Sequence, residues 1–191
     1  TVIAAGSGAG KTLAFYLPAL TQLIAEGTPG RHSQIIAIYP RKELLRDQLA
    51  SLMETLAGLR ASGLAVPSVG ALYGSTPSSR EHAVQYGGWK RSADSLISPV
   101  LACPLCKGDL LWPDSRDELV CADCNTTLGS DDFRLTRRQI QQKAPDILFT
   151  TTEMVNRNLG NSAMKRLFAG DRQSGPKFVL FDEIHTYSGM H

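Results

Sequence analysis

Long hydrophobic stretches are missing from this chain of 191 residues. The longest apolar runs, such as Ile35–Tyr39 and Phe178–Phe181, have the length of a strand, whereas a membrane-spanning helix needs roughly 18 to 20 apolar residues. The sequence begins with Thr1 and has no basic and apolar leader typical of secretion. These features argue against a membrane protein and predict a cytoplasmic one, and both ends of the sequence are expected to be cut from a longer chain.

The sequence also has no large excess of charge of either sign and no low-complexity tract. Its 20 basic and 18 acidic residues give a net charge of +2, and 42% of its residues are hydrophobic. This composition excludes an intrinsically disordered or fibrous protein, and the length predicts one domain with a small module. Any nucleic-acid-binding surface must be local, because the total charge provides no basic excess.

Apolar, β-branched runs recur along the chain and alternate with segments of helical spacing. The predicted strands are Thr1–Ala5, Gln34–Tyr39, Val69–Leu72, Ile147–Thr151 and Phe178–Phe181, and the predicted helices are Lys11–Ala25, Lys42–Gly58 and Met154–Phe168. The runs are uninterrupted, which is typical of strands covered on both faces. The pattern predicts an α/β fold with a doubly wound parallel sheet.

A glycine-rich segment joins the first predicted strand to the first predicted helix. It consists of Gly6, Ser7, Gly8, Ala9, Gly10, Lys11 and Thr12. In this position such a string forms a phosphate-binding loop, because its backbone N–H groups and the following helix attract a pyrophosphate. Lys11 is expected to reach the β- and γ-phosphates of ATP, and Thr12 to bind Mg²⁺. A flexible glycine turn is the alternative.

Two adjacent acids follow the last predicted strand. Asp182 is placed to hold Mg²⁺, and Glu183 to polarise the water that attacks the γ-phosphate. Neighbouring residues of an extended chain point in different directions, which suits these two separate roles. His185 follows the acids and is placed to sense the γ-phosphate. A solvated strand end is the alternative for the acids, and an ordinary surface position is an equal alternative for His185.

The phosphate loop and the Asp182–His185 string together resemble the superfamily 2 helicases of the DEAD/DEAH type. Three further segments resemble motifs of the Lhr-like and YprA-like group of DNA helicases. Tyr39–Gln48 looks like motif Ia, Tyr73–Pro77 with Arg80 like motif Ib, and Pro145–Met154 like motif Ic. The resemblance implies a RecA-like, P-loop ATP-binding domain made of residues 1–80 and 145–191.

The resemblance also implies ATP-dependent unwinding of, or movement along, a nucleic acid, with DNA favoured over RNA. The residues expected to contact that nucleic acid are Arg41, Lys42, Gly74, Thr76, Thr151, Thr152 and Glu153. They follow predicted parallel strands, whose carboxyl ends bind ligands in open α/β sheets. Their contacts would go to phosphates and be independent of sequence. A solvated helix start and an ordinary Thr-Pro turn are the alternatives for individual members of the set.

Some features depart from the family pattern. Ile184 replaces an Ala of the DEAH string and Ala9 replaces the usual Ser or Thr, but neither changes a charge or a ligand. A second RecA-like domain of the same polypeptide, with its arginine fingers, is expected to lie outside this sequence. An arginine finger raises the rate by roughly 10³ to 10⁵, so the isolated chain is expected to bind nucleotide weakly and to hydrolyse it slowly.

The four cysteines of the chain fall within a segment, 81–144, that lacks long apolar runs. Cys103 and Cys106 form one C-x₂-C pair, and Cys121 and Cys124 form another. This spacing predicts a tetrahedral Zn²⁺ site in a zinc-ribbon module inserted into the helicase domain. A disulfide framework and an iron–sulfur cluster are the alternatives. Few large apolar residues accompany the cysteines, so zinc is expected to hold the module together.

A basic stretch follows the cysteines on a predicted helix leading to motif Ic. It contains Arg134, Arg137, Arg138 and Lys143, which either extend the nucleic-acid groove or recruit a partner, or form a solvated helix face. Two other classes of protein compete with the helicase interpretation. A P-loop kinase or GTPase-like switch would not explain Asp182 with Glu183, whereas a zinc-dependent binding module with a vestigial ATP site remains the alternative.

Overall fold

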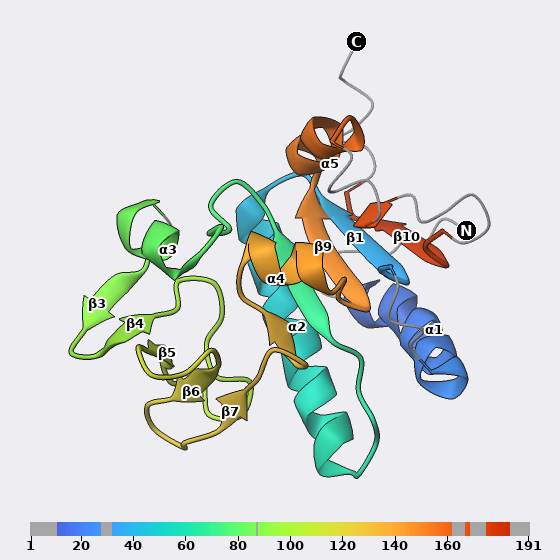
Figure 1. Ribbon diagram of the computed structural model, residues 1–191. Helices are drawn as coiled ribbons and strands as arrows, with labels where there is room; N and C mark the ends of the chain where they lie inside the picture. Colours follow the sequence, from blue (N-terminus) through green and yellow to red (C-terminus); the bar gives the residue numbers. More distant parts are fainter. Residues whose placement is uncertain (1–10, 28–31, 87, 162–166, 169–174, 184–191) are drawn as a thin grey trace.

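The computed structural model describes residues 11–27, 32–86, 88–161, 167–168 and 175–183. The helices are α1 (Lys11–Glu26), α2 (Lys42–Ala61), α3 (Arg80–Tyr86), α4 (Arg137–Gln142) and α5 (Thr152–Leu159). The strands are β1 (Ile35–Tyr39), β2 (Val69–Leu72), β3 (Lys90–Ser92), β4 (Ser95–Ile97), β5 (Leu110–Pro113), β6 (Leu119–Cys121), β7 (Thr127–Leu128), β8 (Phe133–Arg134), β9 (Ile147–Thr151) and β10 (Phe178–Phe181). They form two sheets of five strands each (Figure 1). The predicted first strand and most of the phosphate loop lie outside the described residues.

The larger sheet is parallel throughout, with the strand order β10-β1-β9-β2-β8. Ile38 pairs with Thr150 on one side and with Phe181 on the other, and Leu72 also pairs with Thr150. This register brings the carboxyl ends of four strands to one edge of the sheet. The predicted α/β fold is confirmed, and its ligand-binding edge is the edge at which these four strands end.

Helices cover the faces of this sheet. The apolar positions Leu45, Leu49, Leu52 and Leu56 recur every three or four residues of α2 and are buried. They pack on the central strands β1 and β9, whose residues are buried without exception. In Figure 1, α2 lies behind the sheet and the short helix α4 in front of it. The large sheet therefore has α2 on one face and α4 on the other.

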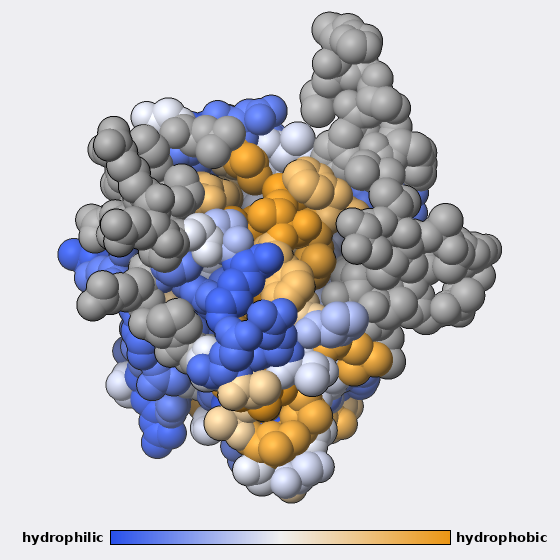
Figure 2. Space-filling model, turned by 90° about the vertical axis from the view of Figure 1, so that its right-hand side faces the viewer, coloured by the Kyte–Doolittle hydropathy of each residue, from blue (hydrophilic) through white to orange (hydrophobic). Residues whose placement is uncertain are grey.

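Among the described strands, β10 lies at one edge of the large sheet, and it differs from the sequence-based prediction of a strand covered on both faces. Its burial alternates, and the side chains of Val179 and Phe181 are 45% and 51% exposed. Figure 2 shows apolar side chains on the side of the molecule that carries β10 and α1, and Leu17 of α1 is also exposed. An uninterrupted apolar run does not distinguish a central strand from an edge strand, because both are apolar before their neighbours are known.

The predicted helix Met154–Phe168 is wrong in its extent. Helix α5 begins at Thr152, after the Thr151 hydroxyl accepts a hydrogen bond from Met154 N (3.4 Å), and it ends at Leu159. Gly160 caps its carboxyl end, and the Asn158 side chain donates to the Met154 carbonyl (2.7 Å). Glycine disfavours continuation of a helix, and Gly160 and Asn161 are not helical, whereas Leu167 and Phe168 are.

The smaller sheet is antiparallel, with the order β3-β4-β5-β6-β7, and it lies beside the large sheet (Figure 1). Strands β5 and β6 form a hairpin between the two cysteine pairs. Against expectation, this module buries large apolar side chains, which join one hydrophobic cluster with those of the large sheet. Trp112 is 2% exposed and its ring lies 5.3 Å from that of Trp89, with Leu96, Leu110 and Leu119 fully buried nearby in the same cluster.

Both ends of the cysteine-containing segment meet the large sheet. Strand β8 pairs with β2 in that sheet, although it falls within the predicted insertion. The backbone N–H of Arg137 donates to the Pro77 carbonyl (2.8 Å), so the chain departs and returns at neighbouring points. Arg134, expected on the basic helix, lies instead in β8 and is 3% exposed. Across the described ranges, no helix is both long and apolar enough to cross a membrane.

Candidate active site and metal centre

The carboxyl edge of the large sheet gathers every described residue that sequence analysis placed in the ATP and nucleic-acid sites. Arg41 and Lys42 follow β1 and are exposed, and Lys42 lies 3.8 Å from the Glu43 carboxylate. The loop after β2, the start of α5 after β9, and the two acids after β10 lie on the same edge. These strand ends lie together because the strands are parallel and in register. Basic, hydroxyl and acidic groups therefore lie along one side of the molecule.

The two acids are held at the end of β10 by backbone contacts. Asp182 N donates to the Ile38 carbonyl (3.2 Å), which continues the β1–β10 ladder by one residue. The Asp182 carboxylate then accepts a hydrogen bond from Glu183 N (2.9 Å), and Glu183 adopts a φ of 51°. This left-handed conformation turns the chain sharply after Asp182. The two carboxylates therefore diverge, with Asp182 half-buried and Glu183 exposed.

A tyrosine pair lies in the core near Asp182, and sequence analysis did not identify it. The hydroxyls of Tyr16 in α1 and Tyr39 in β1 are 2.6 Å apart, and both rings stack on Phe149. Burial is the main cause that raises the pKa of Tyr16 well above its ordinary value. The neighbouring Tyr39 hydroxyl and the charge of Asp182 raise this pKa further. The pair links α1, which follows the predicted phosphate loop, to the strand that precedes Arg41. Gly6 to Gly10 and His185 lie outside the described residues, as do the side chains of Lys11 and Thr12.

The loop after β2 uses its threonine differently from the expectation. The Thr76 hydroxyl donates to the Ala71 carbonyl (2.8 Å) and accepts from Tyr73 N (2.9 Å), and Thr76 is only 2% exposed. A hydroxyl committed to its own loop cannot donate to a phosphate at the surface, so Thr76 orders the turn. Gly74, by contrast, is exposed.

The start of α5 presents one exposed group of the three that were expected. Thr151 is 8% exposed and caps the helix, and the Thr152 hydroxyl is buried without a hydrogen-bond partner among the described residues. Glu153 is exposed and pairs with Arg157 one turn further along (3.1 Å). An acid at the start of a helix stabilises it through the helix dipole.

The four cysteines come from two turns with the same hydrogen bonding. Cys103 N donates to Gly108 O and Lys107 N to Cys103 O, and in the second turn Cys121 N donates to Thr126 O and Asn125 N to Cys121 O. The residue after each C-x₂-C pair, Lys107 or Asn125, has a positive φ of 67° or 58°. Each turn thereby directs both of its sulfurs inward.

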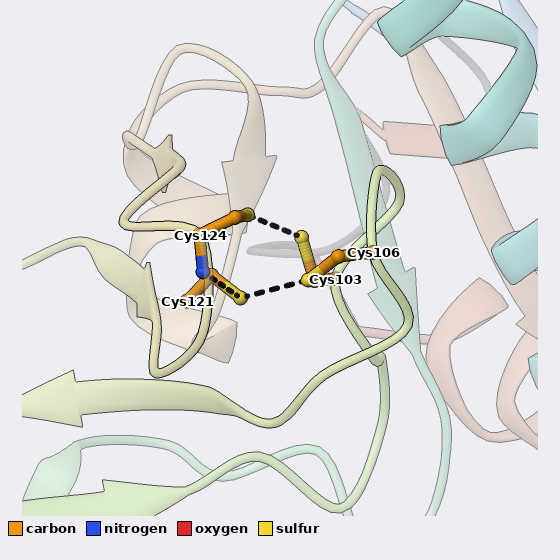
Figure 3. Close-up of side chains that lie close together, drawn as sticks. All are labelled: Cys103, Cys106, Cys121 and Cys124. Atoms are coloured by element: carbon orange, nitrogen blue, oxygen red, sulfur yellow. Dashed lines mark hydrogen bonds between the residues drawn. The ribbon is translucent and has the colours of Figure 1, made fainter.

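The four Sγ atoms face one another and all lie within 4.8 Å (Figure 3). Cys106 and Cys121 are 3.3 Å apart and Cys103 and Cys124 are 3.6 Å apart, whereas four thiolates around one Zn²⁺ at about 2.3 Å are separated by about 3.8 Å. The Thr126 hydroxyl contacts the Cys124 sulfur (3.2 Å) and lowers the pKa of that thiol to about 6. A set of four sulfurs this close fits a single tetrahedral ion and is too narrow for a cluster of several irons.

Arg80 fastens the cysteine-containing module to the large sheet. Its guanidinium lies 4.3 Å from the Trp112 ring centroid, donates to the carbonyls of Trp112 and Pro113, and pairs with Asp114 (2.7 Å). A second contact joins Gln139 Nε2 in α4 to Asp117 in the turn between β5 and β6 (2.8 Å). The turn between β5 and β6 is thus held by Arg80, which precedes the small sheet in the sequence, and by Gln139, which follows it.

We expect Arg80→Ala to destabilise the protein by about 2 kcal/mol, because it removes a stacked cation and donors to buried carbonyls. Arg91→Ala is the matched control, because Arg91 pairs with the same Asp114 but is 52% exposed and stacks on no ring. An exposed ion pair contributes under about 1 kcal/mol. Urea denaturation of both variants measures the difference, and equal losses would show that Arg80 contributes only its ion pair.

The described parallel sheet, with acidic and basic groups at the carboxyl ends of its strands, has the α/β architecture that binds ligands at that edge. Among models of known families, that of the DEAD/DEAH box helicase matches residues 1–97, and that of Trm112p-like proteins matches residues 94–128, which include the four cysteines. The first match covers 97 of the 191 residues, and the chain belongs to the DEAD/DEAH box helicase family. Comparisons with curated proteins and with solved structures found no match.

Proposed function

We propose that this chain is the ATP-binding half of a nucleic-acid-dependent helicase or translocase that acts on DNA. Its helicase domain would comprise residues 1–80 and 145–191, and residues 81–144 would form the inserted zinc module. The observation that carries the proposal is the shared edge of the large sheet, where Asp182 and Glu183 lie with Arg41 and Lys42. ATP bound there would lie next to a bound strand, as coupling of hydrolysis to movement requires. The Lhr-like subgroup and the choice of DNA remain predictions.

The predicted site residues would have separate roles in ATP binding and hydrolysis. Gly6, Ser7, Gly8, Ala9 and Gly10 would hold the phosphates of ATP with Lys11, while Thr12 and Asp182 would hold Mg²⁺, which neutralises phosphate charge when it is bound. Glu183 would orient and deprotonate the attacking water, and its turn away from Asp182 leaves its carboxylate exposed for that role. His185 would respond to the γ-phosphate. A second RecA-like domain of the same polypeptide would complete the site.

The four thiolates of Cys103, Cys106, Cys121 and Cys124 would hold a structural Zn²⁺, with no open position for catalysis. Bound zinc would lock the two cysteine turns together. Because both turns and the hairpin between them belong to the small sheet, the ion would set the shape of the whole module. A cytoplasmic, reducing compartment favours thiolates over disulfides.

The test measures ATP hydrolysis by the intact protein, meaning the polypeptide with its proposed second RecA-like domain. The rate is measured without nucleic acid, with single-stranded DNA, and with single-stranded RNA of the same length. We expect DNA to raise the rate clearly above the basal value and RNA to raise it less. A rate that neither nucleic acid changes, in protein shown to bind ATP, would contradict the proposed function. A larger effect of RNA would overturn only the choice of DNA.

A further inference from the structure

Arg137 is the first residue of α4, at the point where the chain returns from the cysteine-containing module. Its side chain reaches across to the loop after β2, Tyr73–Thr76. The Nε atom donates to Thr76 O (2.8 Å), and Nη2 donates to Gly74 O (2.9 Å) and Tyr73 O (3.3 Å). Three carbonyls thus fix the plane of one guanidinium. Nη1 makes no hydrogen bond to any described residue.

Arg137 differs from most of the other arginines within the described ranges in having no acidic partner. Arg60, Arg80 and Arg116 each pair with an Asp or Glu. Within the described ranges no carboxylate lies within 4.0 Å of Arg137. Its partners are neutral carbonyls, although burial and the nearby Arg157 lower its pKa. A fixed, half-buried positive charge with a donor left over is suited to an anion.

Two further arginines act on Arg137 or on this loop from other helices. Arg157 in α5 repels the charge of Arg137; its side chain is 61% exposed and pairs with Glu153 (3.1 Å). Burial raises the pKa of the Tyr73 hydroxyl to about 12, and the charge of Arg46 in α2, which is exposed, opposes this rise. Among the described residues, Glu153 compensates the charge of Arg157 but no carboxylate compensates that of Arg137, which an anionic ligand would stabilise. All three lie at the carboxyl edge of the large sheet, on the same side as Arg41 and Lys42.

We propose that Arg137 and Arg157 bind a phosphate group of a nucleic-acid strand at the rim of the Tyr73–Thr76 loop. This inference rests on the proposed function and adds to it a contact that comes from the return of the inserted module. A strand is the fitting source of the phosphate, because Arg41 and Lys42 lie at the same edge of the sheet as Arg137 and Arg157 and could contact further phosphates of the same strand. Arg137 is already held in place, so little conformational entropy would be lost on binding.

The test measures the affinity of the intact protein for a labelled single-stranded oligothymidylate over a series of salt concentrations. Arg137→Gln is expected to weaken binding about tenfold. The slope of log K against log salt is expected to fall by about 0.7, the value for one phosphate contact with a single strand. Arg157→Gln is expected to lower the slope by the same amount. Its exposed side chain makes none of the loop contacts, so this second variant does not depend on an intact loop.

Arg60→Gln is the matched control, because Arg60 lies at the opposite end of α2 and pairs with Asp132. It should leave affinity and slope unchanged. If the slope of log K against log salt in both Arg137→Gln and Arg157→Gln equals that of the wild type, the inference is overturned. Arg137 would then only stabilise the loop. Failure of the wild-type protein to bind the oligonucleotide would instead overturn the proposed function, so the two failures are distinguishable.

Discussion

Cys121→Ser is expected to abolish stoichiometric zinc binding and to unfold the small antiparallel sheet. Cys121 is 1% exposed, ends β6, and accepts hydrogen bonds through its sulfur from the N–H groups of Asp123 (3.4 Å) and Cys124 (3.5 Å). Zinc supplies an apparent folding free energy of about 10 to 16 kcal/mol in small zinc-finger peptides. The module also buries Trp112 in the hydrophobic cluster that it shares with the large sheet, so we expect the loss to be smaller here but still sufficient to open β5, β6 and β7.

Zinc content by elemental analysis and amide hydrogen exchange of the same sample measure this effect. Protection of β5–β7 should be lost, while that of β1 and β9 in the large sheet should persist. Ser115→Ala, in the turn of the same hairpin, is the control and should keep both the zinc and the protection. A Cys121→Ser protein with a full equivalent of zinc and protected β5 and β6 amides would contradict the metal assignment. Chelation of zinc from the wild-type protein should reproduce the exchange pattern of the variant.

Glu183→Gln is expected to lower ATP hydrolysis by about 10³-fold while ATP affinity is kept, because a positioned general base contributes about 10² to 10⁴ in rate. Glutamine keeps the size of the side chain, and Glu183 is exposed, so the turn after β10 should survive. Asp182 retains its carboxylate and its hydrogen bond from residue 183. The loss should therefore appear in kcat and not in KM for ATP.

Steady-state hydrolysis by the intact protein, with saturating nucleic acid, gives both constants. Glu26→Gln is the control, because Glu26 is an exposed acid at the far end of α1 that pairs with Lys177. It should change neither constant. If Glu183→Gln hydrolysed ATP at the wild-type rate, the water-activating group would have to be sought elsewhere and the assignment of this acid would be wrong.

Features that depend on neighbouring residues in the sequence were predictable. The uninterrupted runs that became β1, β2 and β9 and the regular leucines of α2 are local patterns, and a parallel sheet follows from their alternation. The two cysteine pairs were predictable for the same reason, because each pair is contained within a single turn. The arrangement of the site follows from the fold, since parallel strands place their carboxyl ends together.

Features that depend on distant contacts were not predictable. Arg137 and the loop it binds are about sixty residues apart, and nothing in the local sequence distinguishes it from Arg138, which is exposed. The hydroxyl of Thr76 was expected at the surface because its role in the turn appears only when Ala71 and Tyr73 fold around it. The stack of Arg80 on Trp112 likewise joins two segments whose sequences give no sign of each other.

The hydrogen bond between Arg137 N and the Pro77 carbonyl has a consequence for the evolution of this chain. The points where the inserted segment departs and returns are in contact, so a much shorter connection would also close the gap. Loop-closure entropy grows slowly with length, and a helicase ancestor could therefore have acquired the zinc module in one event without disturbing the order of strands β10, β1, β9 and β2. Such a junction is also a natural place at which to exchange the module for another in an engineered enzyme.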